Sequence, residues 1–142
     1  MVALLRFLAL ALPAAVLVLA LTSFGAGALG LGPDLEPLAA RGLARPGGLP
    51  FRLAALALAF EATALVALFL LVEGRSGWPV ADGLAAGAAA WLFRGPLLVL
   101  AVAHLTRLPT EPFWQAARVE LVALPAAGAA IGALAAWTRA RR

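Results

Sequence analysis

Two long apolar runs of this chain each carry one charge near the middle, and these two charges are opposite in sign. Glu61 lies within LALAFEATALVALFLLV, and Arg94 lies within GLAAGAAAWLFRGPLLVLAVA. A charged side chain at the centre of a bilayer costs about 2.5–3.5 kcal/mol on insertion scales. A carboxylate and a guanidinium can offset that cost by forming an ion pair. Alternatively, the carboxylate can carry a proton, with the guanidinium as its counter-charge.

The spacing of Glu61 and Arg94 suits an ion pair between neighbouring helices. A polar turn centred near Ser76 separates the two runs, with Glu61 fifteen residues before it and Arg94 eighteen residues after it. In an antiparallel hairpin the two depths differ by three residues, or about 4.5 Å of helix rise, which an arginine side chain spans. We therefore predict an intramembrane pair between Glu61 and Arg94. Its role is either to set the register of the two helices or to act in transport.

Small residues share a helix face with each of these charges. Ala57 and Ala64 lie on the face of Glu61, and Gly83 and Gly87 lie on that of Arg94. Small faces allow helix backbones to approach closely in lipid, and the G-x-x-x-G motif is typical of such contacts. We predict four glycines as helix-packing positions, namely Gly83, Gly87, Gly128 and Gly132.

The chain offers little further chemistry. Its only histidine, His104, lies ten residues beyond Arg94, about 15 Å along a helix, near the end of its run. We interpret it either as an interfacial side chain or as an accessory polar group of a transport path. Hydroxyls are few, and no metalloprotease, phosphate-loop or nucleophile-elbow motif occurs. We therefore predict no enzyme activity, no catalytic residue, no metal site and no cofactor.

Composition indicates a membrane protein. Of 142 residues, 64% are apolar and 13% are charged, against about half and a quarter in soluble domains. A chain of this size cannot bury so much apolar surface in a soluble core, so the bilayer is its expected solvent. There is no cysteine, and all eleven basic residues are arginines. The arginines lie mostly in loops and at the C-terminus, without the clustered patch that would indicate nucleic-acid binding.

Apolar runs of about 20 residues are long enough to cross a bilayer. The sequence predicts an all-α integral membrane protein, a single membrane domain over 1–142, with four transmembrane helices in an antiparallel bundle with short loops. The spans are expected at about 7–31, 51–72, 80–105 and 117–137. The first run can also be interpreted as a signal peptide with Arg6 before it and cleavage near Ala26-Gly27-Ala28. Its length favours a span.

Helix-breaking residues and aromatic residues occur between and within these spans. Prolines and glycines interrupt residues 32–50, where we expect either a short interfacial helix between Pro37 and Arg45 or an irregular loop. Pro96 follows Arg94 closely and is expected to kink the third span. Asp82 is expected to complement the dipole of that helix. Three tryptophans suit the interfacial belt, namely Trp78, Trp114 and Trp137.

Function follows less directly from the sequence. We predict a multi-pass protein of the cell membrane, of the bacterial inner-membrane type, with both termini in the cytoplasm. Its expected role is that of a non-catalytic membrane component, such as a subunit, an assembly factor or an interaction partner. Expected partners are the lipid bilayer, a second copy of the chain or another membrane protein, and no nucleic acid. The alternative is a small proton-linked transporter or channel using Glu61 and Arg94.

Overall fold

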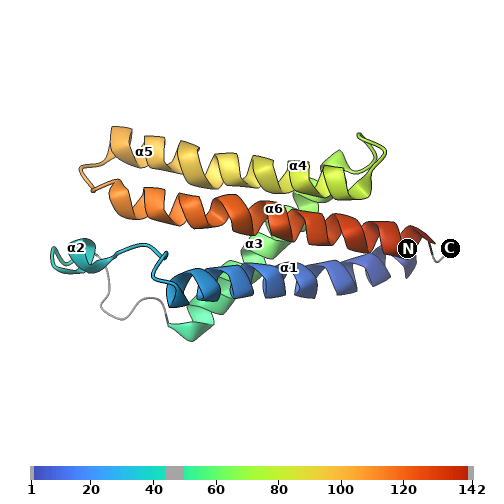
Figure 1. Ribbon diagram of the computed structural model, residues 1–142, viewed down its shortest axis with the longest axis horizontal. Coiled ribbons are helices and arrows are strands. Elements are labelled where there is room, and N and C mark those ends of the chain that lie inside the picture. Colours follow the sequence, from blue (N-terminus) through green and yellow to red (C-terminus); the bar gives the residue numbers. More distant parts are fainter. Residues whose placement is uncertain (1, 44–49, 141–142) are drawn as a thin grey trace.

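The computed structural model describes residues 2–43 and 50–140, and all its regular elements are helical (Figure 1). These are α1 (Val2–Ala28), α2 (Glu36–Ala39), α3 (Phe51–Val72), α4 (Pro79–Leu92), the π-helical turn η1 (Phe93–Leu97), α5 (Leu98–Leu105) and α6 (Glu111–Ala140). Because α4, η1 and α5 follow one another without a break, they form one long helix. Four helices among the described residues are thus long and apolar enough to cross a membrane. This confirms the predicted all-α class with four long apolar helices.

Helix α6 lies at the centre of the arrangement. It contacts α1, α3, α4, η1 and α5, and its contact with α4 is the most extensive in the structure. The start of α1, the end of α6 and the α3–α4 turn lie at one end of the molecule, which we call the terminal end (Figure 1). The segment containing α2 and the α5–α6 turn lie at the other, which we call the α2 end. Helix α3 passes behind the others at an angle.

The first and last long helices differ in length from the expected spans. Helix α1 ends at Ala28 rather than at residue 31, because Gly30 adopts a φ of 69° and the Leu31 N–H bonds the Ala26 carbonyl oxygen. This left-handed conformation suits glycine and terminates helices. Helix α6 begins at Glu111 rather than near residue 117, because Pro112 is compatible with a first helical turn. The first turns of α6 are therefore helical although they contain several polar residues.

The segment between α1 and α3 contains one short helix. Helix α2 covers Glu36–Ala39, and the chain then turns through Gly42, whose φ is 68°. The Leu43 N–H bonds the Leu38 carbonyl oxygen and closes this turn. The short helix expected between Pro37 and Arg45 is thus present in part, and residues 44–49, including Arg45, lie outside the described residues.

The core is built mainly from small side chains with a few large ones. The largest fully buried side chains are Phe69, Leu65, Leu124 and Ile131. Helix α1 contributes a buried row at helical spacing, and Phe7 packs on Phe69 with ring centroids 5.8 Å apart. The outer surface is also apolar, with several large side chains more than 70% exposed, including Phe24, Phe51, Phe60, Trp78 and Leu105. The molecule is therefore apolar both inside and outside.

Helices α4 and α6 meet through glycines. A Cβ placed on Gly83 would overlap the carbonyl oxygen of Gly128, and one placed on Gly87 would overlap that of Leu124. In the same way, a Cβ on Gly132 would overlap the carbonyl oxygen of Pro79. The two backbones therefore touch directly, which a side chain larger than hydrogen at these positions would prevent.

We expect Gly83→Ala to destabilise the protein by about 1–3 kcal/mol, the usual cost of overpacking, because the added methyl group would push α4 from α6. The matched control is Gly27→Ala in α1, where an added Cβ meets nothing within 4 Å. That control should be neutral or more stable by up to about 1 kcal/mol, since alanine favours helix. Thermal unfolding of the detergent-purified variants measures both. Equal melting temperatures would contradict the direct backbone contact.

Candidate functional site

Arg94 lies in a helical turn that proline has altered. Pro96 has no N–H and its ring collides with the carbonyl four residues earlier, so a regular α-helix cannot continue through it. The structure accommodates Pro96 in the π-helical turn η1 rather than in a sharp kink. Such turns insert one extra residue per turn and rotate the following residues around the helix axis. Gly83 and Gly87, which precede η1, face α6, whereas Ala101 and His104, which follow it and would share their face in a regular helix, are exposed.

Arg94 bridges two carboxylates. Its Nη1 lies 2.5 Å from Oε1 of Glu61 on α3, and its Nε lies 2.8 Å from Oε1 of Glu120 on α6. Three long helices thus each contribute one charge to a single group, which we call the charge cluster. With all three side chains ionised, two negative charges and one positive charge give a net charge of −1. The structure therefore brings together the two residues predicted to pair and adds a third.

The three residues of the charge cluster lie at similar distances from the α2 end of their helices. Glu61 is ten residues from the start of α3, Arg94 is eleven residues from the end of α5, and Glu120 is nine residues from the start of α6. At about 1.5 Å per residue these separations are about 14–16 Å from the α2 end. This is half the thickness of a bilayer's hydrocarbon core, about 30 Å.

The charge cluster lies at the side of the bundle rather than on its axis. Its carboxylate side chains are 13% exposed at Glu61 and 19% exposed at Glu120, but the Arg94 side chain is 48% exposed. Among the described residues α3 packs on α1, α4 and α6, but its backbone does not come close to η1 or α5. The Arg94 side chain therefore reaches Glu61 across an opening between α3 and α5.

Exposed residues, three of them alanines, lie on α3 and α5 close in sequence to Glu61 and Arg94. On α3, Ala57 and Ala64 lie one turn before and one turn after Glu61 and are exposed. On α5, Leu98 and Ala101 follow Arg94 at helical spacing and are also exposed. We call these four residues, together with Arg94, the open face. It combines three alanines and Leu98 with the half-exposed charge of Arg94.

The other residues singled out in the sequence lie away from the charge cluster. His104 is exposed at the α2 end of α5. Trp114 and Trp137 lie near opposite ends of α6, and Trp78 lies in the exposed α3–α4 turn. A tryptophan that sequence reasoning did not single out, Trp91, donates its Nε1–H to the Ala117 carbonyl oxygen at 2.8 Å. That hydrogen bond holds α4 against α6 just before η1.

Sequence reasoning missed Glu120 as part of the site. The predicted fourth span began near residue 117, which placed Glu120 at the membrane surface, where a carboxylate needs no partner. In the structure α6 begins at Glu111, so Glu120 lies more than two turns inside the helix. The sequence does predict a helix start at Thr110, with Glu111 and Pro112 in the first turn, but the membrane span was placed later and Glu120 was not considered as a partner of Arg94.

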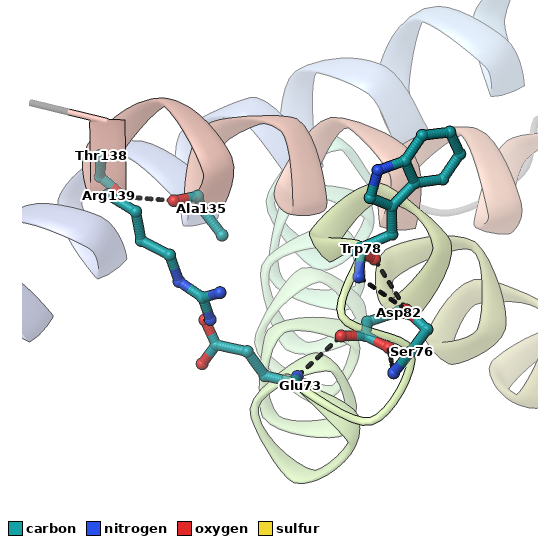
Figure 2. A network of polar contacts seen from close by, with 8 residues as sticks. Glu73, Ser76, Trp78, Asp82, Ala135, Thr138 and Arg139 are labelled. Atoms are coloured by element: carbon teal, nitrogen blue, oxygen red, sulfur yellow. Dashed lines mark hydrogen bonds and ion pairs between the residues drawn. The ribbon is translucent and has the colours of Figure 1, made fainter.

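Asp82 forms a separate polar network in the α3–α4 turn (Figure 2). It is 3% exposed, and its two carboxylate oxygens accept the N–H groups of Gly74 at 2.7 Å and Ser76 at 3.0 Å. An ion pair of 2.5 Å between Arg139 and Glu73 joins the end of α6 to the same turn. Asp82 lies in the first turn of α4, where an acidic side chain suits the helix dipole. Its hydrogen bonds fix the turn, which indicates a structural role.

The three-residue cluster should respond unequally to removal of its members. We expect Arg94→Gln to be the most destabilising single change, because it leaves two carboxylates close together without a cation. Breaking a buried ion pair costs up to about 3–5 kcal/mol, and we expect less here because Arg94 is half exposed. Glu61→Gln and Glu120→Gln should each cost clearly less, since Arg94 keeps one carboxylate partner. Thermal unfolding of the three purified variants tests this order. Equal losses of stability in Glu61→Gln and Arg94→Gln, with no loss in Glu120→Gln, would indicate a simple ion pair.

Comparison with known proteins gives no guide to this arrangement. No protein-family model matches the chain, no curated protein matches it, and no solved structure matches it.

Proposed function

We propose that this chain is an integral membrane protein whose four long helices cross the bilayer as an antiparallel bundle. The apolar outer surface supports this placement, because large side chains such as Phe51, Phe60 and Leu105 would be costly in water and are favourable in lipid. Helix α1 contributes Phe7, Ala11, Ala15 and Leu19 to the core, which favours a permanent span over a cleaved signal peptide. The proposed location is a cell membrane, with the chain crossing it four times.

We further propose that the chain is a non-catalytic component that docks a transmembrane helix of another membrane protein on its open face. The observation that carries this proposal is the half-exposed side chain of Arg94 at mid-depth. Charged residues inside membranes almost always face a bundle interior, a partner or a water-filled cavity, because contact with lipid is costly. A second helix lying between α3 and α5 would remove Arg94 from lipid.

The open face suits a helix in shape and in charge. Ala57 and Ala64 leave room on α3 for the backbone of a neighbouring helix to approach closely. The group that the open face exposes most is the guanidinium of Arg94, so the face favours a partner that offers hydrogen-bond acceptors or a carboxylate at the same depth. A second copy of this chain would bring another cluster of the same net sign. We therefore favour a different membrane protein as the partner.

Site-specific cross-linking tests the docking proposal. Because the chain has no native cysteine, a maleimide reacts only at the introduced cysteine. A photoreactive maleimide attached to Ala101→Cys should cross-link this chain to a second polypeptide in intact membranes. The matched control is Leu100→Cys, which is on the same helix and is also exposed but points about 100° away. We expect at least several-fold more adduct from position 101. Equal yields at both positions, or none at either, would contradict docking at the open face.

A proton-linked carrier is the second candidate function, and Glu120 is the observation that favours it. Two carboxylates share one guanidinium, so one of them can hold a proton without leaving Arg94 unpaired. Binding of that proton would change the charge of the cluster from −1 to neutral and its release would restore −1, which is how intramembrane carboxylates couple protons to movement.

Proteoliposome flux measures this second function. If the cluster carries protons, wild-type vesicles should show proton movement driven by a substrate gradient. Glu61→Gln and Glu120→Gln should each lower that rate at least tenfold, because each variant removes one of the two carboxylates that share the proton. Asp82→Asn is the control, since Asp82 lies outside the cluster. Flux that is unchanged in both Glu variants would reject the carrier.

A further inference from the structure

A cleft of about 640 Å³ lies on the side of α6 away from the charge cluster, between α6 and the last turns of α1. Its volume lies within the range of small-molecule sites, about 300–1,000 Å³. The chain segment after α1 lines it near the α2 end. The lining residues are Leu21, Thr22, Gly25, Ala26, Leu29, Gly30, Leu31, Gly32, Asp34, Gln115, Arg118, Val119 and Val122.

The cleft changes from apolar to polar along the bundle axis. Leu21 on α1 and Val122 on α6 lie farthest from the α2 end and are apolar. Thr22 is beside them, but its hydroxyl lies 2.8 Å from the Val18 carbonyl oxygen of its own helix. The polar residues Asp34, Gln115 and Arg118 lie nearer the α2 end. A lipid has the same gradient, with its headgroup at the membrane surface and its acyl chains toward the middle.

Arg118 is the only cationic residue that lines the cleft, and it has no ion pair or hydrogen bond to any other described residue. Its polar neighbours are engaged with one another. The Asp34 N–H donates to Oε1 of Gln115 at 2.7 Å, and Oδ1 of Asp34 accepts the Glu36 N–H at 3.0 Å. Arg118 is exposed and therefore available to an anion from outside the chain. A guanidinium matches the geometry of a phosphate and can bind it through two parallel hydrogen bonds.

We propose that this cleft binds one phospholipid, with its phosphate against Arg118 and an acyl chain between α1 and α6. The wall on the α1 side includes Gly25 and Ala26, whose small side chains leave room for the chain. The cleft's polarity gradient places the headgroup at the α2 end. This inference depends on the bilayer placement proposed above and does not depend on a partner at the open face.

Lipid titration of the purified full-length protein tests the site. In a neutral detergent, phosphatidylglycerol should bind at one molecule per chain by native mass spectrometry and should raise the unfolding temperature. Arg118→Gln should weaken the affinity about tenfold, since a charge-assisted hydrogen bond is lost. The matched control is Arg107→Gln, an exposed arginine at the same end of the bundle but outside the cleft, which should leave the affinity within about twofold.

A second variant tests the acyl-chain part of the site without changing any charge. Val122 is 65% exposed, so Val122→Trp should fold normally while filling the apolar part of the cleft. It should abolish the one-to-one complex. Inorganic phosphate alone should produce no increase in unfolding temperature, because it lacks an acyl chain to bury.

Two results would overturn the proposal. Equal weakening by Arg118→Gln and Arg107→Gln would show a general attraction to positive charge, and full binding by Val122→Trp would show that no chain enters the cleft. Vesicle flotation separates this failure from failure of the membrane placement. A chain that does not float with phosphatidylglycerol vesicles would refute both proposals. If the chain floats but the wild type and Arg118→Gln bind lipid equally well, only the lipid site is refuted.

Discussion

The direct backbone contact between α4 and α6 is the constraint on which the rest of the arrangement depends. Gly83 and Gly128 bring the two helices together near the terminal end, and Trp91 holds them together by its hydrogen bond to Ala117. Gly95 continues this line, since a Cβ there would lie 3.2 Å from the Cβ of Ala117. Because α4 lies this close to α6 up to η1, Nε of Arg94 reaches Glu120 on α6.

The charge cluster then positions α3, which is otherwise held mainly at the terminal end. There the Asp82 network fixes the α3–α4 turn, and Phe69 packs on Phe7. Toward the α2 end the backbone of α3 separates from that of α5, and the side chain of Arg94 bridges the distance to Glu61. An ion pair is sensitive to geometry, so it specifies the angle and register of α3 more sharply than apolar contacts alone. The same bridge leaves Arg94 half exposed. One residue can therefore both set the register of α3 and take part in the proposed docking of a helix.

Much of the fold could be predicted from the sequence because lipid-crossing helices have a strong compositional signal. Four long apolar helices and the proximity of Glu61 to Arg94 follow from run length and helical spacing. The four glycines were predicted as packing positions, but the pairing of α4 with α6 was not predicted. Two further features did not follow from run length and helical spacing alone. The π-helical turn at Pro96 rotates Ala101 away from the face of Gly83, and the early start of α6 places Glu120 at mid-depth. The orientation in the membrane stays a prediction, since the arginines divide almost evenly between the two ends.

Helix geometry explains why the charges of α6 do not neutralise one another. Residues two apart lie on nearly opposite faces of a helix, so Arg118 cannot reach Glu120 although only one residue separates them in sequence. Glu120 instead joins Arg94, which leaves the ionised cluster with one excess negative charge. Arg118 is left on the other side of α6 with one unneutralised positive charge. In a bilayer each excess charge favours a partner of opposite sign or a polar surrounding. This difference in charge between the two sides of α6 is the physical basis of the two proposals, a docked helix beside the charge cluster and an anionic headgroup at the cleft.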